Sequence, residues 1–153
     1  GIHCRVGMEG IVAEAHWDGS RNTIAQFLGR RRYVLVDPDH TCDMYLLAKN
    51  HPSGRHSKVD WSNPDSWEKF PDFPTMPAHE VVQRPGDFLY LPTYYLHYIV
   101  SIDTNYQCNT RSGRDDRQLK VVNKCTPGFE KQAAPRGIRG KKAWPTNVPL
   151  AIH

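Results

Sequence analysis

Short strand-like runs, each ending at a turn that contains glycine or proline, constrain the fold of this chain more than any other feature. Residues 2–8, 11–17 and 30–36 are three such runs, rich in β-branched and aromatic side chains. Residues 79–102 contain two or three more, separated by turns of the same kind. Residues 22–29 fit either a helix or a strand. The sequence therefore predicts an all-β sandwich or barrel, with jelly rolls included.

This pattern stops near residue 110, and the chemistry of the chain changes there. Residues 111–153 show no sustained period, and they hold half of the twenty lysines and arginines but only three of the sixteen acidic residues. We predict a β-barrel core over residues 1–110 and a basic, irregular C-terminal extension over residues 111–153 that becomes ordered only against a partner. Because the chain begins inside a strand-like run, we expect the barrel to be partial at its N-terminus.

The basic extension suggests which partners to expect. Its charge favours contact with neighbouring protein subunits or with an anionic membrane surface. Nucleic acid is not expected, because the extension has few of the aromatic side chains on which single-stranded bases stack. No apolar run approaches the roughly 18–20 residues that cross a bilayer, so we expect no transmembrane segment.

The four cysteines lie far apart in the sequence. Cys4, Cys42, Cys108 and Cys125 form no CxxC pair, which argues against a structural zinc site. A disulfide framework stays open, but we expect free thiols. Free thiols would place the protein in a reducing intracellular compartment or an organelle interior rather than outside the cell.

A histidine and an aspartate two residues apart, in the stretch "AEAHWDGSRN", raise the question of a metal site. On a strand, His16 and Asp18 would project from the same face. The candidate for a third ligand is His97, in the aromatic-rich stretch "LPTYYLHYIVS". Two histidines and one carboxylate form the facial triad of non-haem iron(II) oxygenases, although manganese, cobalt or zinc also fit these ligands. The other histidines, His56 among them, lie beside turns, where exposure to solvent explains them.

Three longer stretches carry a resemblance to a known family. They are "GMEGIVAEAHWDGSRNTIAQFLGRRRYVLVDPD", "HPSGRHSKVDWSNPDSWEKFPDFP" and "RPGDFLYLPTYYLHYIVSI". In this order and spacing, residues 2–110 resemble the catalytic half of JmjC-type cupin oxygenases, in particular the asparaginyl hydroxylase branch typified by factor inhibiting hypoxia-inducible factor. The resemblance implies a double-stranded β-helix, a jelly-roll barrel that holds iron(II) and the co-substrate 2-oxoglutarate.

The resemblance also implies roles for individual residues. His16, Asp18 and His97 match the three metal ligands of the family. Arg31 lies where relatives have a lysine that pairs with the distal carboxylate of 2-oxoglutarate. A guanidinium makes the same ion pair with two parallel hydrogen bonds, although it is longer and bulkier than an ammonium.

Other positions line the family's co-substrate pocket. Asn22 and Asn109 match amides of that pocket, whereas Ala13 stands where a relative has a threonine hydroxyl. After Asn109, the aromatic continuation usual in the family is replaced by "NTRSG". We therefore expect a complete set of metal ligands beside an altered co-substrate pocket.

Two functions of different classes follow from these observations. The first is an iron(II)- and 2-oxoglutarate-dependent dioxygenase that hydroxylates a protein side chain or a related substrate. The alternative is a catalytically reduced cupin that serves as a structural or interaction subunit of a larger protein assembly. The complete ligand set favours the enzyme, and the altered pocket and the basic extension favour the subunit.

Overall fold

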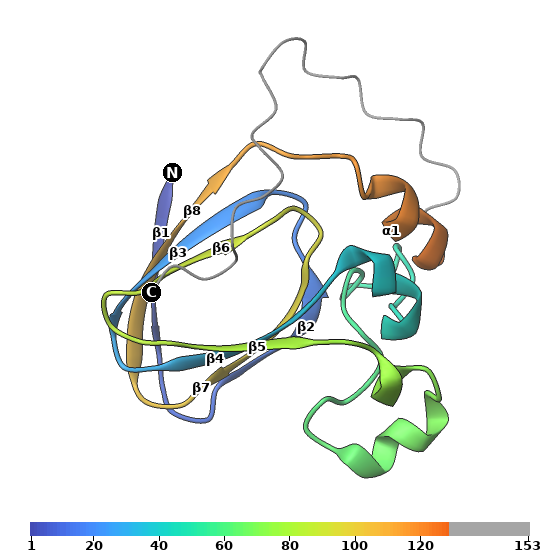
Figure 1. The fold of residues 1–153 in the computed structure, drawn as a ribbon, viewed down its shortest axis with the longest axis horizontal. Coiled ribbons are helices and arrows are strands. Elements are labelled where there is room, and N and C mark those ends of the chain that lie inside the picture. Colours follow the sequence, from blue (N-terminus) through green and yellow to red (C-terminus); the bar gives the residue numbers. More distant parts are fainter. Residues whose placement is uncertain (129–153) are drawn as a thin grey trace.

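The computed structural model describes residues 1–128, and these residues form two β-sheets with a group of short helices at one side (Figure 1). Each sheet contains four antiparallel strands, in the orders β1-β8-β3-β6 and β2-β7-β4-β5. The strands are β1 (Ile2–Gly7), β2 (Val12–Trp17), β3 (Arg21–Leu28), β4 (Arg31–Val36), β5 (His79–Gln83), β6 (Phe88–Leu91), β7 (Leu96–Ser101) and β8 (Asn105–Ser112).

Two facing four-stranded sheets are the architecture of a jelly roll, so the predicted fold class is confirmed. Residues 2–112 supply the eight strands of the two sheets. That the barrel is partial at its N-terminus stays a prediction. Strands next to each other in a sheet are far apart in the sequence, since β1 pairs with β8 and β2 pairs with β7. This pairing brings the two ends of the core together.

The ambiguous segment at residues 22–29 is a strand. Asn22, Ile24 and Gln26 are buried on one face of β3, which is the two-residue alternation of a β-strand. The strand ends at Gly29, which has a φ of +63° and lies against the Thr104 carbonyl. A side chain at position 29 would collide with that carbonyl, so the turn between β3 and β4 requires glycine.

Two hydrophobic clusters hold the core together. One cluster lies between the sheets and consists of Ile24, Tyr33, Leu35, Leu89, Leu91 and Ile99. The other joins the second sheet to the helical side of the molecule and consists of Ala15, Trp17, Val36, Met44, Leu46, Tyr94, Leu96, Tyr98 and Val122. Strand β7 contributes to both clusters, because Ile99 and Leu96 lie on its opposite faces.

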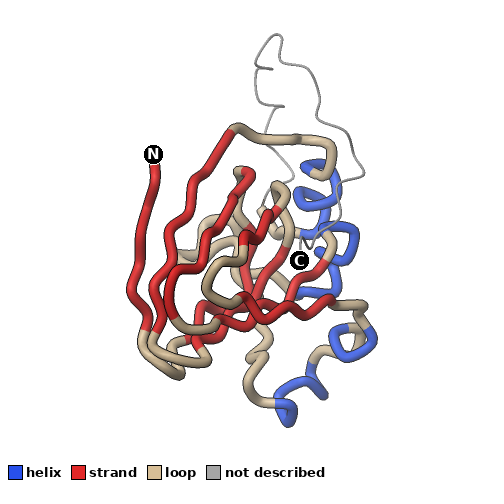
Figure 2. The backbone as a smooth tube through the Cα atoms, turned by 60° about the vertical axis from the view of Figure 1, so that its left-hand side comes forward, coloured by secondary structure: helices blue, strands red, loops and turns tan. Residues whose placement is uncertain are grey.

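The helical side contains three 3-10 helices and one α-helix, gathered away from most of the strands (Figure 2). They are η1 (Pro38–Met44), η2 (Pro64–Lys69), η3 (Phe73–Thr75) and α1 (Leu119–Cys125). Within the described residues, no helix is long and apolar enough to cross a membrane.

Helix α1 corrects part of the sequence prediction. It lies inside residues 111–153, which we expected to be irregular, and Val122 at its centre is fully buried in the second hydrophobic cluster. The start of the predicted extension therefore packs on the core. The rest of that extension, residues 129–153, lies outside the described residues.

The expectation of free thiols is wrong, because all four cysteines are paired. Cys4 joins Cys108 across β1 and β8, at directly opposite positions of the two strands. Cys42 in η1 joins Cys125 at the end of α1. Sequence spacing did not show these pairs, since each is brought together only by the fold. The expected reducing compartment rested on free thiols and loses that support, because disulfides persist mainly in oxidising compartments.

Candidate metal centre

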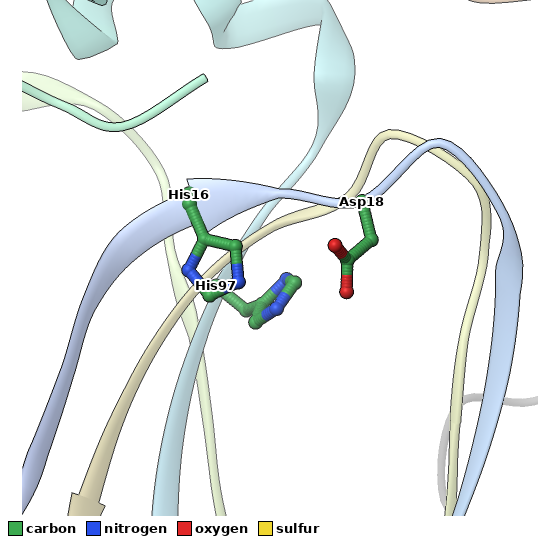
Figure 3. A group of neighbouring side chains, drawn as sticks. All are labelled: His16, Asp18 and His97. Atoms are coloured by element: carbon green, nitrogen blue, oxygen red, sulfur yellow. The ribbon is translucent and has the colours of Figure 1, made fainter. Parts of the chain in front are cut away.

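Three side chains with metal-binding atoms meet at one end of β2 and β7 (Figure 3). His16 is in β2, Asp18 follows the last residue of that strand, and His97 is in β7. His16 and His97 are directly opposite partners in the sheet, and their ring centroids are 4.3 Å apart. One ligand atom from each of the three side chains lies within 4.8 Å of the other two. The three predicted ligands therefore converge on one point.

The alternation of β2 explains why His16 and Asp18 share a face. Ala15 and Trp17 point the other way and are buried in the cluster next to the helices. Burying Trp17 on one side leaves its two neighbours on the side of the barrel interior. A register shift between Ala13 and His16 also lets Ala13 line the same pocket as His16.

Hydrogen bonds set the orientation of both imidazoles. The Nδ1 of His16 is 2.7 Å from the Glu14 carbonyl oxygen, and the Nδ1 of His97 is 2.9 Å from the Tyr95 carbonyl oxygen. A carbonyl only accepts, so each Nδ1 carries the proton and donates it. The lone pair of each Nε2 is then available to a metal, which is how metal-binding histidines are commonly fixed.

The protonation states also suit a metal. Burial lowers the pKa of His97 to about 4, and burial lowers the pKa of His16 as well. Burial alone would raise the pKa of Asp18, but the neighbouring His97 and Arg111 outweigh it and hold the pKa of the carboxyl below its ordinary value. At neutral pH the site therefore presents two neutral imidazoles and one carboxylate, the forms that coordinate a divalent cation.

Two arginines that sequence reasoning did not assign to the site hold the carboxylate. Arg55 donates to Oδ1 of Asp18 at 3.1 Å, and Arg111 donates to Oδ2 at 2.6 Å. The side chain of Asp18 is only 10% exposed, so these ion pairs compensate for its burial. In the sequence, the one indication of a role for Arg111 was the stretch "NTRSG", which stands where the family has an aromatic residue after Asn109.

His56 also lies beside the site, and the sequence did not predict its position. Its ring stacks on that of His16 with centroids 4.9 Å apart, and its backbone forms an isolated bridge with His16. The Nδ1 of His56 is 3.0 Å from the carbonyl oxygen of Ser53. His56 does not belong to the group of converging ligand atoms among the described residues.

A pocket of about 190 Å³, lined by both polar and apolar side chains, opens at the three ligands, a size that suits a small acid better than a drug-sized ligand. The predicted co-substrate residues Asn22, Asn109 and Arg31 all line it, as does Ala13. The Nδ2 of Asn109 donates to Oδ1 of Asn22 at 2.8 Å. Arg5 donates to Oδ1 of the same Asn109 at 2.5 Å, so the two amides have a defined orientation.

Arg31 brings a buried guanidinium with one unpaired donor to this pocket. It is 8% exposed, and its Nε has no hydrogen-bond partner among the described residues. Two residues further along β4, on the same face, Tyr33 is fully buried and donates its hydroxyl to Gln107. Burial raises the pKa of Tyr33 to about 12, with the Arg31 guanidinium opposing this shift. A buried guanidinium with an unpaired donor is a receptor for a carboxylate.

The fold and this centre together define a cupin with a two-histidine, one-carboxylate site. The family model described as "Cupin-like domain" matches residues 1–112, which contain every strand of the jelly roll. The chain belongs to this family, whose JmjC-domain members include proteins similar to this one.

Three of these relatives show the range of the similarity. JmjC domain-containing protein D of Dictyostelium discoideum is 30% identical over 105 residues, which cover 69% of this chain and 23% of that protein. Lysine-specific demethylase 8 of Danio rerio is 33% identical over 105 residues, covering 69% and 25%. tRNA wybutosine-synthesizing protein 5 of Gallus gallus is 33% identical over 98 residues, covering 63% and 29%. The chain thus spans less than a third of the length of these relatives.

Proposed function

We propose that this protein is an iron(II)- and 2-oxoglutarate-dependent dioxygenase that hydroxylates a protein side chain or a related substrate. The observation that carries the proposal is the position of Arg31. A buried guanidinium with an unpaired donor lines the same small pocket as three converging metal ligands. A co-substrate that binds the metal and carries a second carboxylate needs both a metal site and a cationic group that pairs with this carboxylate. Membership of the cupin-like family supports the same reading.

The metal would be held by Nε2 of His16, Nε2 of His97 and one oxygen of Asp18. These three ligands leave further coordination positions open, which is the property of facial-triad sites that activate dioxygen. With iron(II) and 2-oxoglutarate bound, dioxygen would be the oxidant of an unactivated C–H bond. One oxygen atom would enter succinate as 2-oxoglutarate loses carbon dioxide, and the other would enter the hydroxylated substrate. The protein supplies positioning, charge and protection from water.

The residues of the pocket divide this work. Arg31 would bind the distal carboxylate of 2-oxoglutarate, and its burial would strengthen that ion pair. The hydrogen-bonded Asn22 and Asn109 offer fixed amide groups to the bound acid. Ala13 offers no hydroxyl to the bound acid, whereas Tyr33, which lines the same pocket, carries one.

The names of the relatives do not indicate a single class of substrate. One is named a lysine-specific demethylase and another a tRNA wybutosine-synthesizing protein, so the family includes more than one kind of substrate. We propose a protein substrate because the asparaginyl hydroxylase branch resembles residues 2–110 in motif order and spacing. Nucleic acid stays the less favoured substrate.

Loss of the metal ligand tests the proposal directly. With iron(II) and 2-oxoglutarate supplied in air, the wild-type protein should form succinate, and Asp18→Ala should not. Asp103→Ala is the matched control, because Asp103 is a carboxylate paired with Arg30 on the surface, away from the pocket. Equal succinate formation by wild type and Asp18→Ala would show that the site has been assigned to the wrong residues.

One observation favours the alternative function of an interaction subunit. The sheet β1-β8-β3-β6 carries large apolar side chains that are exposed to solvent. They are Ile2, Val6, Phe27, Leu28, Phe88, Tyr90 and Tyr106. Single exposed apolar residues are ordinary, but a group on one sheet is typical of a surface that another protein covers. The same surface is compatible with an enzyme, so it does not replace the first proposal.

A further inference from the structure

Arg111 lies next to the metal ligands at a position where the family usually has an aromatic residue. It follows Asn109 by two residues on β8, so both side chains point to the interior, and both line the pocket. Its Cα is opposite that of Asn22 in the neighbouring strand. A guanidinium thus stands between the co-substrate amides and Asp18.

The two arginines that hold Asp18 are anchored differently. Besides the carboxylate, Arg55 donates to the Trp17 carbonyl at 3.0 Å, and its guanidinium lies 5.7 Å from the centre of the Trp17 ring. Arg111, in contrast, has Asp18 as its one hydrogen-bonded side-chain partner among the described residues. The side chains of both arginines are 42% exposed, so the difference between them lies in their contacts.

Metal binding would therefore affect Arg111 more than Arg55. A metal takes one carboxylate oxygen of Asp18 and weakens the attraction of that carboxylate for both guanidiniums. Arg55 keeps its contacts with Trp17. Arg111 would lose much of its ion pair with Asp18, the one that it makes among the described residues, and its donors would become available to a ligand in the pocket.

The charges of the pocket indicate what Arg111 would then bind. Among the residues that line the pocket, Arg5, Arg31 and Arg111 are cationic and Asp18 is the one carboxylate. A divalent metal adds two positive charges, and 2-oxoglutarate removes two. The loaded pocket thus keeps an excess of positive charge, which attracts anions.

We propose that Arg111 binds an anionic oxygen group of the primary substrate, a carboxylate or a phosphate, next to the metal. This inference rests on the proposed function, and it narrows the substrate to an acidic one. Arg111 is a specificity-determining residue in this account. Arg31 serves the co-substrate, and Arg55 keeps Asp18 in place.

The test measures binding of small anions to the loaded protein. The protein is saturated with manganese(II) and with N-oxalylglycine, an unreactive analogue of 2-oxoglutarate, and both binding steps are followed by calorimetry. The α-amides of N-acetylaspartate and N-acetyl-O-phosphoserine, which are acids through their side chains alone, and the neutral α-amide of N-acetylasparagine are then titrated separately. We expect one of the two acids to bind at least about tenfold more tightly than the neutral compound, because a charge-assisted pair is worth on the order of one tenfold step.

Variants assign this preference to Arg111. Arg111→Gln should reduce the preference for the acid to about unity, and Arg111→Lys should keep part of it. Arg32→Gln is the matched control, because Arg32 pairs with Glu80 on the outer face of β4. The better-bound acid distinguishes a carboxylate from a phosphate substrate.

Other outcomes would overturn the inference in distinguishable ways. If the loaded wild type binds neither acid better than the neutral compound, or if Arg111→Gln and Arg32→Gln behave alike, Arg111 does not recognise the substrate. If Arg111→Gln mainly weakens N-oxalylglycine, Arg111 serves the co-substrate instead. If the wild type binds neither manganese(II) nor N-oxalylglycine, the proposed function fails as well.

Discussion

His16 and His97 are opposite partners of two neighbouring strands, and each donates its Nδ1 proton to the main-chain carbonyl of the residue two positions earlier in the chain. The two imidazoles are thereby held in the same tautomer by the backbone. Both Nε2 atoms are left with free lone pairs beside Asp18. The main-chain carbonyls of Glu14 and Tyr95 set this arrangement.

Replacing either histidine should therefore abolish tight metal binding. We expect His97→Ala to lower manganese(II) affinity by at least about a hundredfold, since loss of even an outer-shell partner costs 10–100-fold. His56→Ala is a demanding control, because its ring stacks on His16 but is not among the converging ligands. Calorimetric titration of manganese(II) into both variants measures the two affinities. Similar losses in the two variants would mean that His56 is a ligand.

The lowered histidine pKa predicts how the metal-free protein responds to acid. The pKa of His97 falls from 6.5 to about 4 on folding because of burial. Between these two values the unfolded chain binds a proton that the folded chain does not, so stability is lost as the pH falls from 6.5 towards 4. The urea midpoint should drop over this interval, and His97→Gln should make the drop smaller. An unchanged pH profile in that variant would contradict the assignment.

Arg31 should determine the affinity for 2-oxoglutarate without changing the affinity for the metal. Removing one partner of a buried charged pair costs about 2–5 kcal/mol, so Arg31→Ala should weaken 2-oxoglutarate binding by at least about thirtyfold. Arg31→Lys, which restores the residue type found in relatives, should retain most of the affinity. Manganese(II) binding measured without the co-substrate should be the same in all three proteins. A loss of metal affinity in Arg31→Ala would show that the variant damages the fold.

The disulfide between Cys42 and Cys125 should stabilise the helical side. It closes a loop of 83 residues and ties α1 to η1, whereas Cys4–Cys108 ties two strands that already pair. We expect the Cys42→Ser, Cys125→Ser double variant to lose about 2–4 kcal/mol of unfolding free energy. Urea unfolding with and without a reductant measures this loss. Mass spectrometry of the unreduced wild type should show no reactive thiols, and four free thiols would contradict both bonds.

The sequence predicted those features of the fold and the site that depend on residues close together in the chain. The HxD spacing placed His16 and Asp18 on one face, because alternation along a strand needs no knowledge of the rest of the fold. The all-β class followed from short runs and turns, whereas the double-stranded β-helix came from the resemblance to a known family. His97 was a candidate from its aromatic-rich run, and the resemblance implied its role as a ligand.

Contacts between residues far apart in the sequence could not be predicted in this way. Arg111 meets Asp18 across 93 residues, and Cys4 meets Cys108 across 104, and both contacts depend on which strands lie next to β8. Helix α1 has only seven residues, and its helical form depends on the burial of Val122 and on the bond to η1. Tertiary packing fixed these features, and intrinsic propensity did not reveal them.

The most direct test of the central claim is an anaerobic titration of iron(II) and 2-oxoglutarate into the full-length protein. The bound pair gives a weak visible charge-transfer band. We predict that the band appears in the wild type at equimolar iron(II), that it is lost in Asp18→Ala, and that Arg31→Ala requires much more 2-oxoglutarate to produce it. A folded wild-type protein that shows no band would contradict the oxygenase and favour the interaction subunit.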